Sequence, residues 1–283
     1  MAEQSRVSGA DPRAPMAPNS ARSEPFFTRH LAWFTTPAII AVFVLIWEVY
    51  VQSSGISKFV LPSPSSIGRA IVFLMQQDYF INHLKLTVTA ILSGFAIAIV
   101  FGTVVGVALG KSRTAERLAN PFVIGSQVTP KVALMPLFLL WLGFGIESKI
   151  AIVALLSFFP ILKNTILGVQ SIERGHKDLF VVIRASPWKR VWSLEIPAVM
   201  PYVLTGIETA SVLAVTGAIV GEYLGGSKGM GAMVVASLNS LQTDQMFATI
   251  IVLTIFGFAF YSAITLIRRY AVPWHGSANL SDV

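Results

Sequence analysis

The sequence predicts an all-α membrane protein with six transmembrane helices. Charged residues make up 12% and hydrophobic residues 54% of the 283 residues, whereas soluble domains are about 25% charged. Six apolar stretches each approach the ~20 residues that a helix needs to cross a bilayer. Lysine and arginine gather in alternate connections between these stretches. There is no cysteine, which excludes disulfides, thiol catalysis and cysteine-ligated metals.

The elements follow in order along the chain. Residues 1–30 are rich in Ala, Pro, Ser and Arg and predict a disordered cytoplasmic tail, followed by a membrane domain over 31–275 and a C-terminal tail at 276–283. Residues 53–85 form a long connection, in which an amphipathic segment around 66–75 is expected on the membrane surface. The six expected spans are about 33–52, 86–110, 120–142, 149–169, 199–223 and 246–267.

The basic residues predict the orientation of these spans. With the N-terminus inside, 15 of the 21 Lys and Arg residues lie on the inner side, five lie on the outer side, and Lys131 falls within a span. Inner connections of membrane proteins are enriched in Lys and Arg. We therefore expect both termini in the cytoplasm of a multi-pass inner-membrane protein. The net charge of +7 reflects this topology, and no nucleic-acid partner is expected.

The connection at about 171–197 mixes charged and apolar residues between two apolar spans. Charges in hydrocarbon cost several kcal/mol each, so this segment belongs in water on the inner side. Its apolar residues are spaced for short amphipathic helices, and we expect residues 178–194 to form two short helices joined near Arg184–Ser186. Ser186 and Pro187 suit the cap and first position of a second helix, and Ile196–Pro197 with Pro201 is expected to end that helix before the next span. The pattern indicates a loop that docks on a soluble partner.

The third apolar stretch is interrupted by polar and helix-breaking residues, which predicts a border of a translocation pathway. Irregular backbone at membrane depth is tolerated where it is buried or lines a cavity, and an intramembrane Lys indicates function. Lys131 could instead pair with Glu208 or extend to water, and Glu222 could be a gate residue or a solvated helix end. The candidate pathway residues are Gln127, Pro130, Lys131, Pro136, Glu208, Gly217 and Glu222.

Small residues recur four apart in two spans, at Gly102, Gly106 and Gly110, and from Gly206 to Gly221. Small residues allow helices to approach closely in a membrane. The ridges favour either packing within one subunit or a fifth helix that slides along a pathway, and the sequence leaves both open.

No catalytic site is expected in this chain. The glycine-rich run 221–231 lacks the Gly-Lys-Ser/Thr order of a phosphate-binding loop. The four histidines lack metal-ligand spacing, so no metal site is predicted. An intramembrane enzyme would need a catalytic constellation that the sequence does not contain. A secondary transporter driven by an ion gradient is the alternative, but it typically has internal repeats and more intramembrane acids.

The stretch 178–201, DLFVVIRASPWKRVWSLEIPAVMP, resembles the cytoplasmic coupling loop of bacterial binding-protein-dependent ABC importer permeases. Asp178 stands at the usual Glu position, although Leu179 and Phe180 replace two alanines and Arg184 replaces a glycine. The runs at 61–64, 130–145, 157–165 and 217–231 are similar to the nitrate/sulfonate/taurine group. The 130–134 run and the 272–275 ending favour members that import vitamin-like heterocycles such as thiamine-precursor pyrimidines or riboflavin.

The resemblance implies the type I importer permease fold and a set of partners. These are a second permease chain, as a homodimer, two ABC ATPase subunits that bind ATP and Mg, and a periplasmic or lipid-anchored binding protein that delivers a small solute. The chain itself would hold no cofactor. The residues implied to couple to the ATPase are Asp178, Val182, Arg184, Ala185, Ser186, Pro187 and Trp188.

Overall fold

The computed structural model describes residues 26–273, which form helices and connecting turns without a β-strand in that range. The all-α prediction is therefore confirmed. The chain divides into two compact units, residues 1–50 and 51–283. Helix α1 (Phe26–Ser53) supplies the described part of the first unit. Helix α1 begins at Phe26, and residues 1–25 of the predicted tail, like the predicted tail at 276–283, lie outside the described residues.

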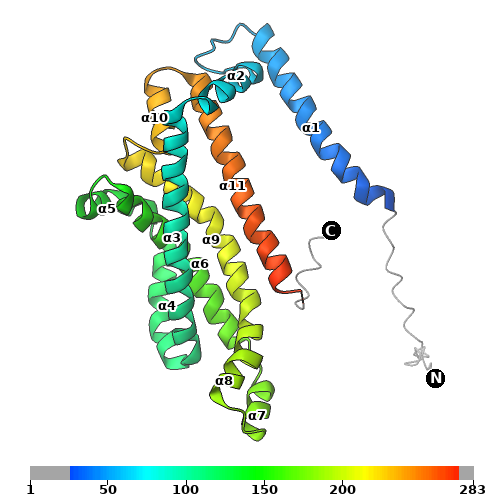
Figure 1. Ribbon diagram of the computed structural model, residues 1–283, viewed down its shortest axis with the longest axis vertical. Coiled ribbons are helices and arrows are strands. Elements are labelled where there is room, and N and C mark those ends of the chain that lie inside the picture. The colour runs from blue at the N-terminus through cyan, green and yellow to red at the C-terminus, as the bar shows by residue number, and fades with distance from the viewer. Residues whose placement is uncertain (1–25, 274–283) are drawn as a thin grey trace, which may run out of the picture. The chain divides into compact units, whose positions relative to one another are not determined.

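The second unit holds the remaining helices (Figure 1). They are α2 (Pro64–Met75), α3 (Asp78–Lys111), α4 (Arg113–Val128), η1 (Lys131–Leu134), α5 (Met135–Leu142), α6 (Ile146–Gln170), α7 (Arg174–Val182), α8 (Pro187–Arg190), η2 (Val191–Glu195), α9 (Ile196–Gly225), α10 (Met230–Asn239) and α11 (Thr243–Ala271). The end that carries α7 and α8 is called the Arg184 end below. The opposite end, where α2 and α10 lie, is called the Gly229 end.

Helix α6 lies at the centre of the second unit, packed on α3 and α9. Glycine makes this possible. A Cβ added at Gly106 would lie 2.6 Å from Cβ of Thr165 in α6, and one added at Gly217 would lie 2.9 Å from Leu156. Ala210, Ala214 and Ala218 are fully buried in the same core. The small-residue ridges are therefore packing surfaces within one subunit, as membrane helices use them.

The third predicted span is broken. Helix α4 and the η1–α5 segment meet at an angle of 87° across a break at Thr129 and Pro130. Proline has no amide hydrogen to continue the helical ladder, and it disfavours helical backbone in the residue before it. Thr129 accordingly takes an extended conformation (ψ 126°). The interruption that the sequence indicated is confirmed, and its form is a bend between two helices.

Four described helices are long and apolar enough to cross a membrane, and the bent pair raises this number to five. Within α1 the apolar helical stretch Pro37–Ser53 is shorter than these. The count of six therefore stays a prediction. The segment expected around 66–75 is confirmed as a helix, α2. Ser63 caps it, Pro64 occupies its first turn, and Ile67, Ala70 and Leu74 form its buried face.

The expectation that Ile196–Pro197 and Pro201 end the helix after Ser186 was wrong. The chain runs from α8 through the π-helical segment η2 directly into α9, with Pro197 in the first turn of α9 and Pro201 inside it. Proline lacks the amide hydrogen that a continuous helix uses in its hydrogen-bond ladder. The wider π-turn, in which Ile196 N donates to Val191 O, precedes Pro197 and keeps the helix continuous.

Candidate functional site

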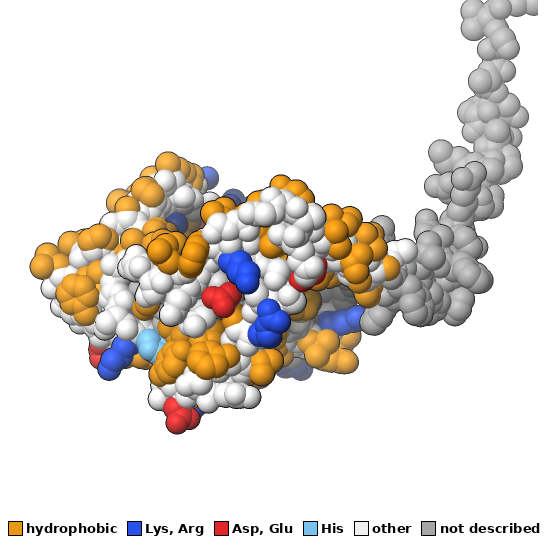
Figure 2. Space-filling model, turned by 90° about the horizontal axis from the view of Figure 1, so that it is seen from above, with side chains coloured by type: hydrophobic (Ala, Val, Ile, Leu, Met, Phe, Trp, Pro, Cys, Tyr) orange, Lys and Arg blue, Asp and Glu red, His pale blue; other side chains and the backbone are white. Residues whose placement is uncertain are grey.

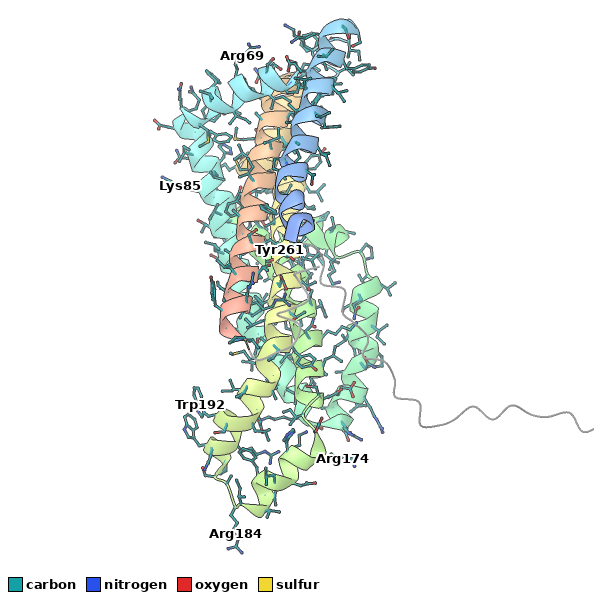
Figure 3. The ribbon with its side chains drawn as sticks, turned by 90° about the vertical axis from the view of Figure 1, so that its right-hand side faces the viewer. Arg69, Lys85, Arg174, Arg184, Trp192 and Tyr261 are labelled. Carbon is teal, nitrogen blue, oxygen red and sulfur yellow. The ribbon has the colours of Figure 1, made fainter. Side chains whose placement is uncertain are left out.

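The Arg184 end carries two short helices joined by a tight turn, as the sequence predicted for 178–194 (Figure 3). Arg184 has φ 49°. Its amide donates to Val181 O and that of Ala185 donates to Phe180 O, each at 3.0 Å. This is the double hydrogen bond of a Schellman helix end. The Ser186 side chain then caps α8 by accepting from Lys189 N at 3.3 Å, with Pro187 in the first turn, which confirms the predicted cap.

The surface of this turn is apolar. Val182 is 78% exposed and Trp188 is 72% exposed, and the rings of Trp188 and Trp192 lie 5.5 Å apart. Contiguous exposed apolar patches mark interaction sites. Asp178 and Arg184 lie exposed beside these residues. The coupling tip is defined here as the exposed apolar residues Leu179, Val181, Val182, Ile183, Trp188 and Trp192.

The base of the coupling tip is tied to the membrane helices by an ion-pair cluster. Glu195, at the end of η2, accepts from Lys111 Nζ at 2.8 Å and lies 3.3 Å from Arg190 Nε. Lys111 is the last residue of α3. Helix α8 is therefore linked both to α9, through the continuous helix, and to α3, through Glu195. No signal in the sequence distinguished Lys111 as the partner of Glu195.

Arg184→Gly is expected to be tolerated and to stabilise the turn. The left-handed backbone conformation costs a residue with a Cβ about 1 kcal/mol, and glycine does not have this cost. The measurement is hydrogen exchange at the Ala185 amide, which should become better protected, together with unchanged transport. Arg184→Ala is the matched control: it removes the guanidinium but keeps the strain. If the alanine variant equalled or exceeded the glycine variant in protection, the strain argument would be wrong.

The candidate pathway residues of the third span lie around the bend. Gln127 lines a pocket of about 270 Å³ between α4 and α6, together with Asn120 and Lys163. The Lys131 ammonium lies 5.0 Å from the ring centre of Phe159 in α6, a cation–π arrangement. Pro130 and Pro136 are exposed on either side of Lys131. Gln127 and Lys131 therefore both lie next to α6.

Glu208 does not pair with Lys131. Its carboxylate accepts from Thr265 Oγ1 at 2.6 Å and lies 3.1 Å from Arg268 Nε. Both partners belong to α11, so this cluster joins α11 to α9 near the Arg184 end. The alternative that Lys131 and Glu208 form an ion pair was wrong, because the final turn of α11 supplies the cation.

Glu222 is buried at the Gly229 end, with 0% exposure, so it is not a solvated helix end. Its carboxylate accepts from Thr87 Oγ1 at 2.7 Å and from Gly231 N at 2.8 Å. Thr87 also accepts from Met230 N at 2.9 Å. Polar groups on α3 and α9 thereby hold the first turn of α10 in place.

Two further residues complete this buried network. His83 Nδ1 lies 2.8 Å from Gly229 N. Lys149, 2% exposed, donates to Lys228 O at 2.7 Å and interacts electrostatically with Glu222. The network thus fixes the turn 226–229 to α3 and α6. Figure 2, which looks onto the Gly229 end, shows a few scattered charges among apolar side chains. Sequence reasoning missed His83, Thr87 and Lys149, which have no local motif.

No group of three or more potential His, Cys, Asp or Glu metal ligands occurs within residues 26–273. The polar sites described above are held together by hydrogen bonds and ion pairs.

Comparison with known proteins identifies the class of protein. Residues 98–274 match the family described as binding-protein-dependent transport system inner membrane component. The chain is 34% identical to the formylaminopyrimidine transport permease protein ThiX of Halalkalibacterium halodurans, over 82% of this chain and 92% of that protein.

Two further relatives have similar coverage. The riboflavin transport system permease protein RibX of Chloroflexus aurantiacus is 31% identical over 85% of this chain and 90% of its own length. The taurine transport system permease protein TauC of Escherichia coli is 27% identical over 84% and 88%. These findings favour an importer over the ion-gradient-driven alternative. The chain therefore belongs to the family of binding-protein-dependent transport system inner membrane components and is a permease subunit of an ABC importer.

Proposed function

We propose that the coupling tip is the surface through which an ABC ATPase subunit drives this permease. The observation that carries the proposal is a solvent-exposed apolar turn whose second helix continues without a break into the span α9. Two ATPase subunits would bind ATP and Mg, since this chain is not expected to have an ATPase site of its own. Closure of the ATPase pair would move α8, and α9 would rotate with it as a rigid body.

Co-purification tests this function. The permease, expressed with its cognate ATPase, should be isolated as a complex that hydrolyses ATP faster when the loaded binding protein is added. A stoichiometry of two permease chains would support the homodimer. A permease that purifies alone and transports without ATP would contradict the proposal.

We also propose six spans with both termini in the cytoplasm, counting α1 and the bent α4–α5 pair as one span each. The bias of Lys and Arg toward one side supports this orientation. The prediction is that a cysteine at Ser186, the only one in the chain, is modified by a membrane-impermeant maleimide only after the cells are opened. A cysteine at Lys228, at the Gly229 end, is the matched control and should react in intact cells. Labelling of Ser186→Cys from outside would exclude the orientation.

The bent segment is proposed as the wall of the translocation pathway, facing the second permease subunit. The exposed residues Gln127, Pro130 and Pro136, with Lys131 among them, support this assignment, because polar and irregular backbone at membrane depth needs water or protein around it. Glu208, Gly217 and Glu222 are buried between helices, so their proposed contribution is to hold the helices that line the pathway. A Gln127→Cys variant whose uptake is unaffected by maleimide would argue against this wall.

For the substrate we propose a small heterocycle. The support is the similarity to a formylaminopyrimidine permease and a riboflavin permease, together with the 130–134 run that the sequence favoured for this class. A thermal-shift screen of the cognate binding protein with pyrimidines, riboflavin, taurine and nitrate tests it. Stabilisation by taurine or nitrate alone would contradict the heterocycle.

A further inference from the structure

A basic pocket lies beside the coupling tip and is not used by the proposed function. Its volume is about 570 Å³, and it is formed where the end of α3, the start of α4, the end of α6 and the start of α7 meet. The side chains that surround it are mostly cationic. They include Lys111, Arg113, Arg117, Arg174 and Lys177, with Glu116 as the one carboxylate.

The cations in this pocket are poorly neutralised within the described chain. Lys111 pairs with Glu195 outside the pocket. The side chains of Arg113, Arg117, Arg174 and Lys177 make no hydrogen bond or ion pair with any described residue. With Glu116 as the only acid, four cations converge on one concave surface. Like charges around one pocket repel each other, so the pocket is electrostatically suited to an anion.

The backbone adds to this positive potential. Arg174 is the first residue of α7. Glu173 holds the cap position before it and lies 3.7 Å from His176 Nδ1, but it makes no side-chain hydrogen bond to the free amides, and the first turn itself holds no acidic residue. A helix start carries a partial positive charge and normally attracts acids. A cation in this position is stabilised when an anion binds between it and the free amides, as phosphates do at helix starts. Figure 3 shows Arg174 at the same end of the unit as Arg184 and Trp192.

An apolar pocket of about 330 Å³ adjoins the basic one. The two share Lys111, Val169 and Ile172, and the apolar pocket runs between α3 and α9 past Val107 and Val199. A free phosphate or nucleotide would leave this second pocket unfilled. A phospholipid offers both chemistries, with a phosphate at one end and an acyl chain at the other.

We propose that the two pockets together bind one anionic phospholipid, with its headgroup among Arg113, Arg117 and Arg174 and an acyl chain between α3 and α9. Basic pockets between membrane helices near the inner surface are typical sites for such lipids. Because η2 lines the apolar pocket through Val191 and Glu195, a bound lipid would support the base of the coupling tip. This inference goes beyond the ATPase proposal and does not rest on it.

The test uses the full-length permease without an ATPase, so that its result is independent of docking. Native mass spectrometry in a delipidating detergent should show retention of phosphatidylglycerol over phosphatidylcholine. The double variant Arg113→Gln/Arg117→Gln should retain about 25-fold less, at about fivefold for each cation near a membrane surface. Arg269→Gln and Lys189→Gln, two exposed cations outside the pocket, are the matched controls and should retain the wild-type amount.

The source of the phosphate is tested separately. Val107→Phe, which fills the apolar pocket, should lower lipid retention, and millimolar glycerol phosphate should not displace the lipid. If glycerol phosphate displaced the lipid and Val107→Phe had no effect, the ligand of the basic pocket would be a free phosphate and not a phospholipid. Equal phosphatidylglycerol retention by wild type and double variant would overturn the proposal, and if that variant also lost a co-expressed ATPase, the pocket would belong to the ATPase interface.

Discussion

Val182→Asp and Trp188→Asp are each expected to abolish coupled transport while the permease still inserts and folds. Both side chains are largely exposed in the isolated subunit, at 78% and 72%, so an aspartate costs little there. In the docked complex the same aspartate would be desolvated without a partner. An unpaired buried charge costs about 3 kcal/mol or more, which weakens docking about a hundredfold or more.

The measurement is the stimulation of ATP hydrolysis by loaded binding protein in reconstituted vesicles, alongside pull-down of the ATPase. Val182→Thr and Trp188→Phe are the matched controls, since they keep shape and neutrality, and both should retain most of the stimulation. Wild-type stimulation and uptake in both aspartate variants would mean that the coupling tip is a solvated loop. Loss of the permease from the membrane fraction would instead show that Val182 and Trp188 serve folding.

Local chemistry is what the sequence predicted well. The cap at Ser186, the turn at Arg184 and the helix α2 each depend on a few neighbouring residues, and the structure confirms them. The break near Pro130 was also predictable, because proline acts on its own backbone. Pro197 shows the limit of such reasoning: the helix continues across this proline because a π-turn precedes it, and that π-turn has no recognised sequence signal.

Long-range pairing was not predictable from one sequence. The sequence offered Lys131 as the cation for Glu208, whereas the packing of α11 on α9 brings Arg268 to it. Glu222 stands 135 residues from Thr87, to which it bonds. A carboxylate at the end of an apolar span, next to a glycine-rich run, indicated a special role for Glu222. The sequence could not identify its hydrogen-bond partners.

Glu222→Ala is expected to cause a large loss of stability, because Glu222 is the most buried charged residue of the described network. The change leaves Gly231 N without an acceptor, leaves Thr87 Oγ1 with only the more distant His83 O as acceptor, and leaves Lys149 without its nearby anion. Removing one member of a buried charged cluster costs about 3–5 kcal/mol. Glu222→Gln should cost less, because an amide can still bond to both groups and only the charge is lost. The measurement is the thermal unfolding midpoint of the purified permease in detergent.

A second substitution reaches the same network through the backbone and separates geometry from charge. Gly229 has φ 113°, and a Cβ there would overlap the Glu222 carboxylate. Gly229→Ala should therefore destabilise the protein about as much as Glu222→Ala although no charge is changed. Gly68→Ala is the matched control, since a Cβ at Gly68 meets nothing within 4 Å and its helical backbone suits alanine. If Gly229→Ala unfolded at the same temperature as Gly68→Ala, the turn 226–229 would be free to move, and Glu222 would not be the residue that holds it.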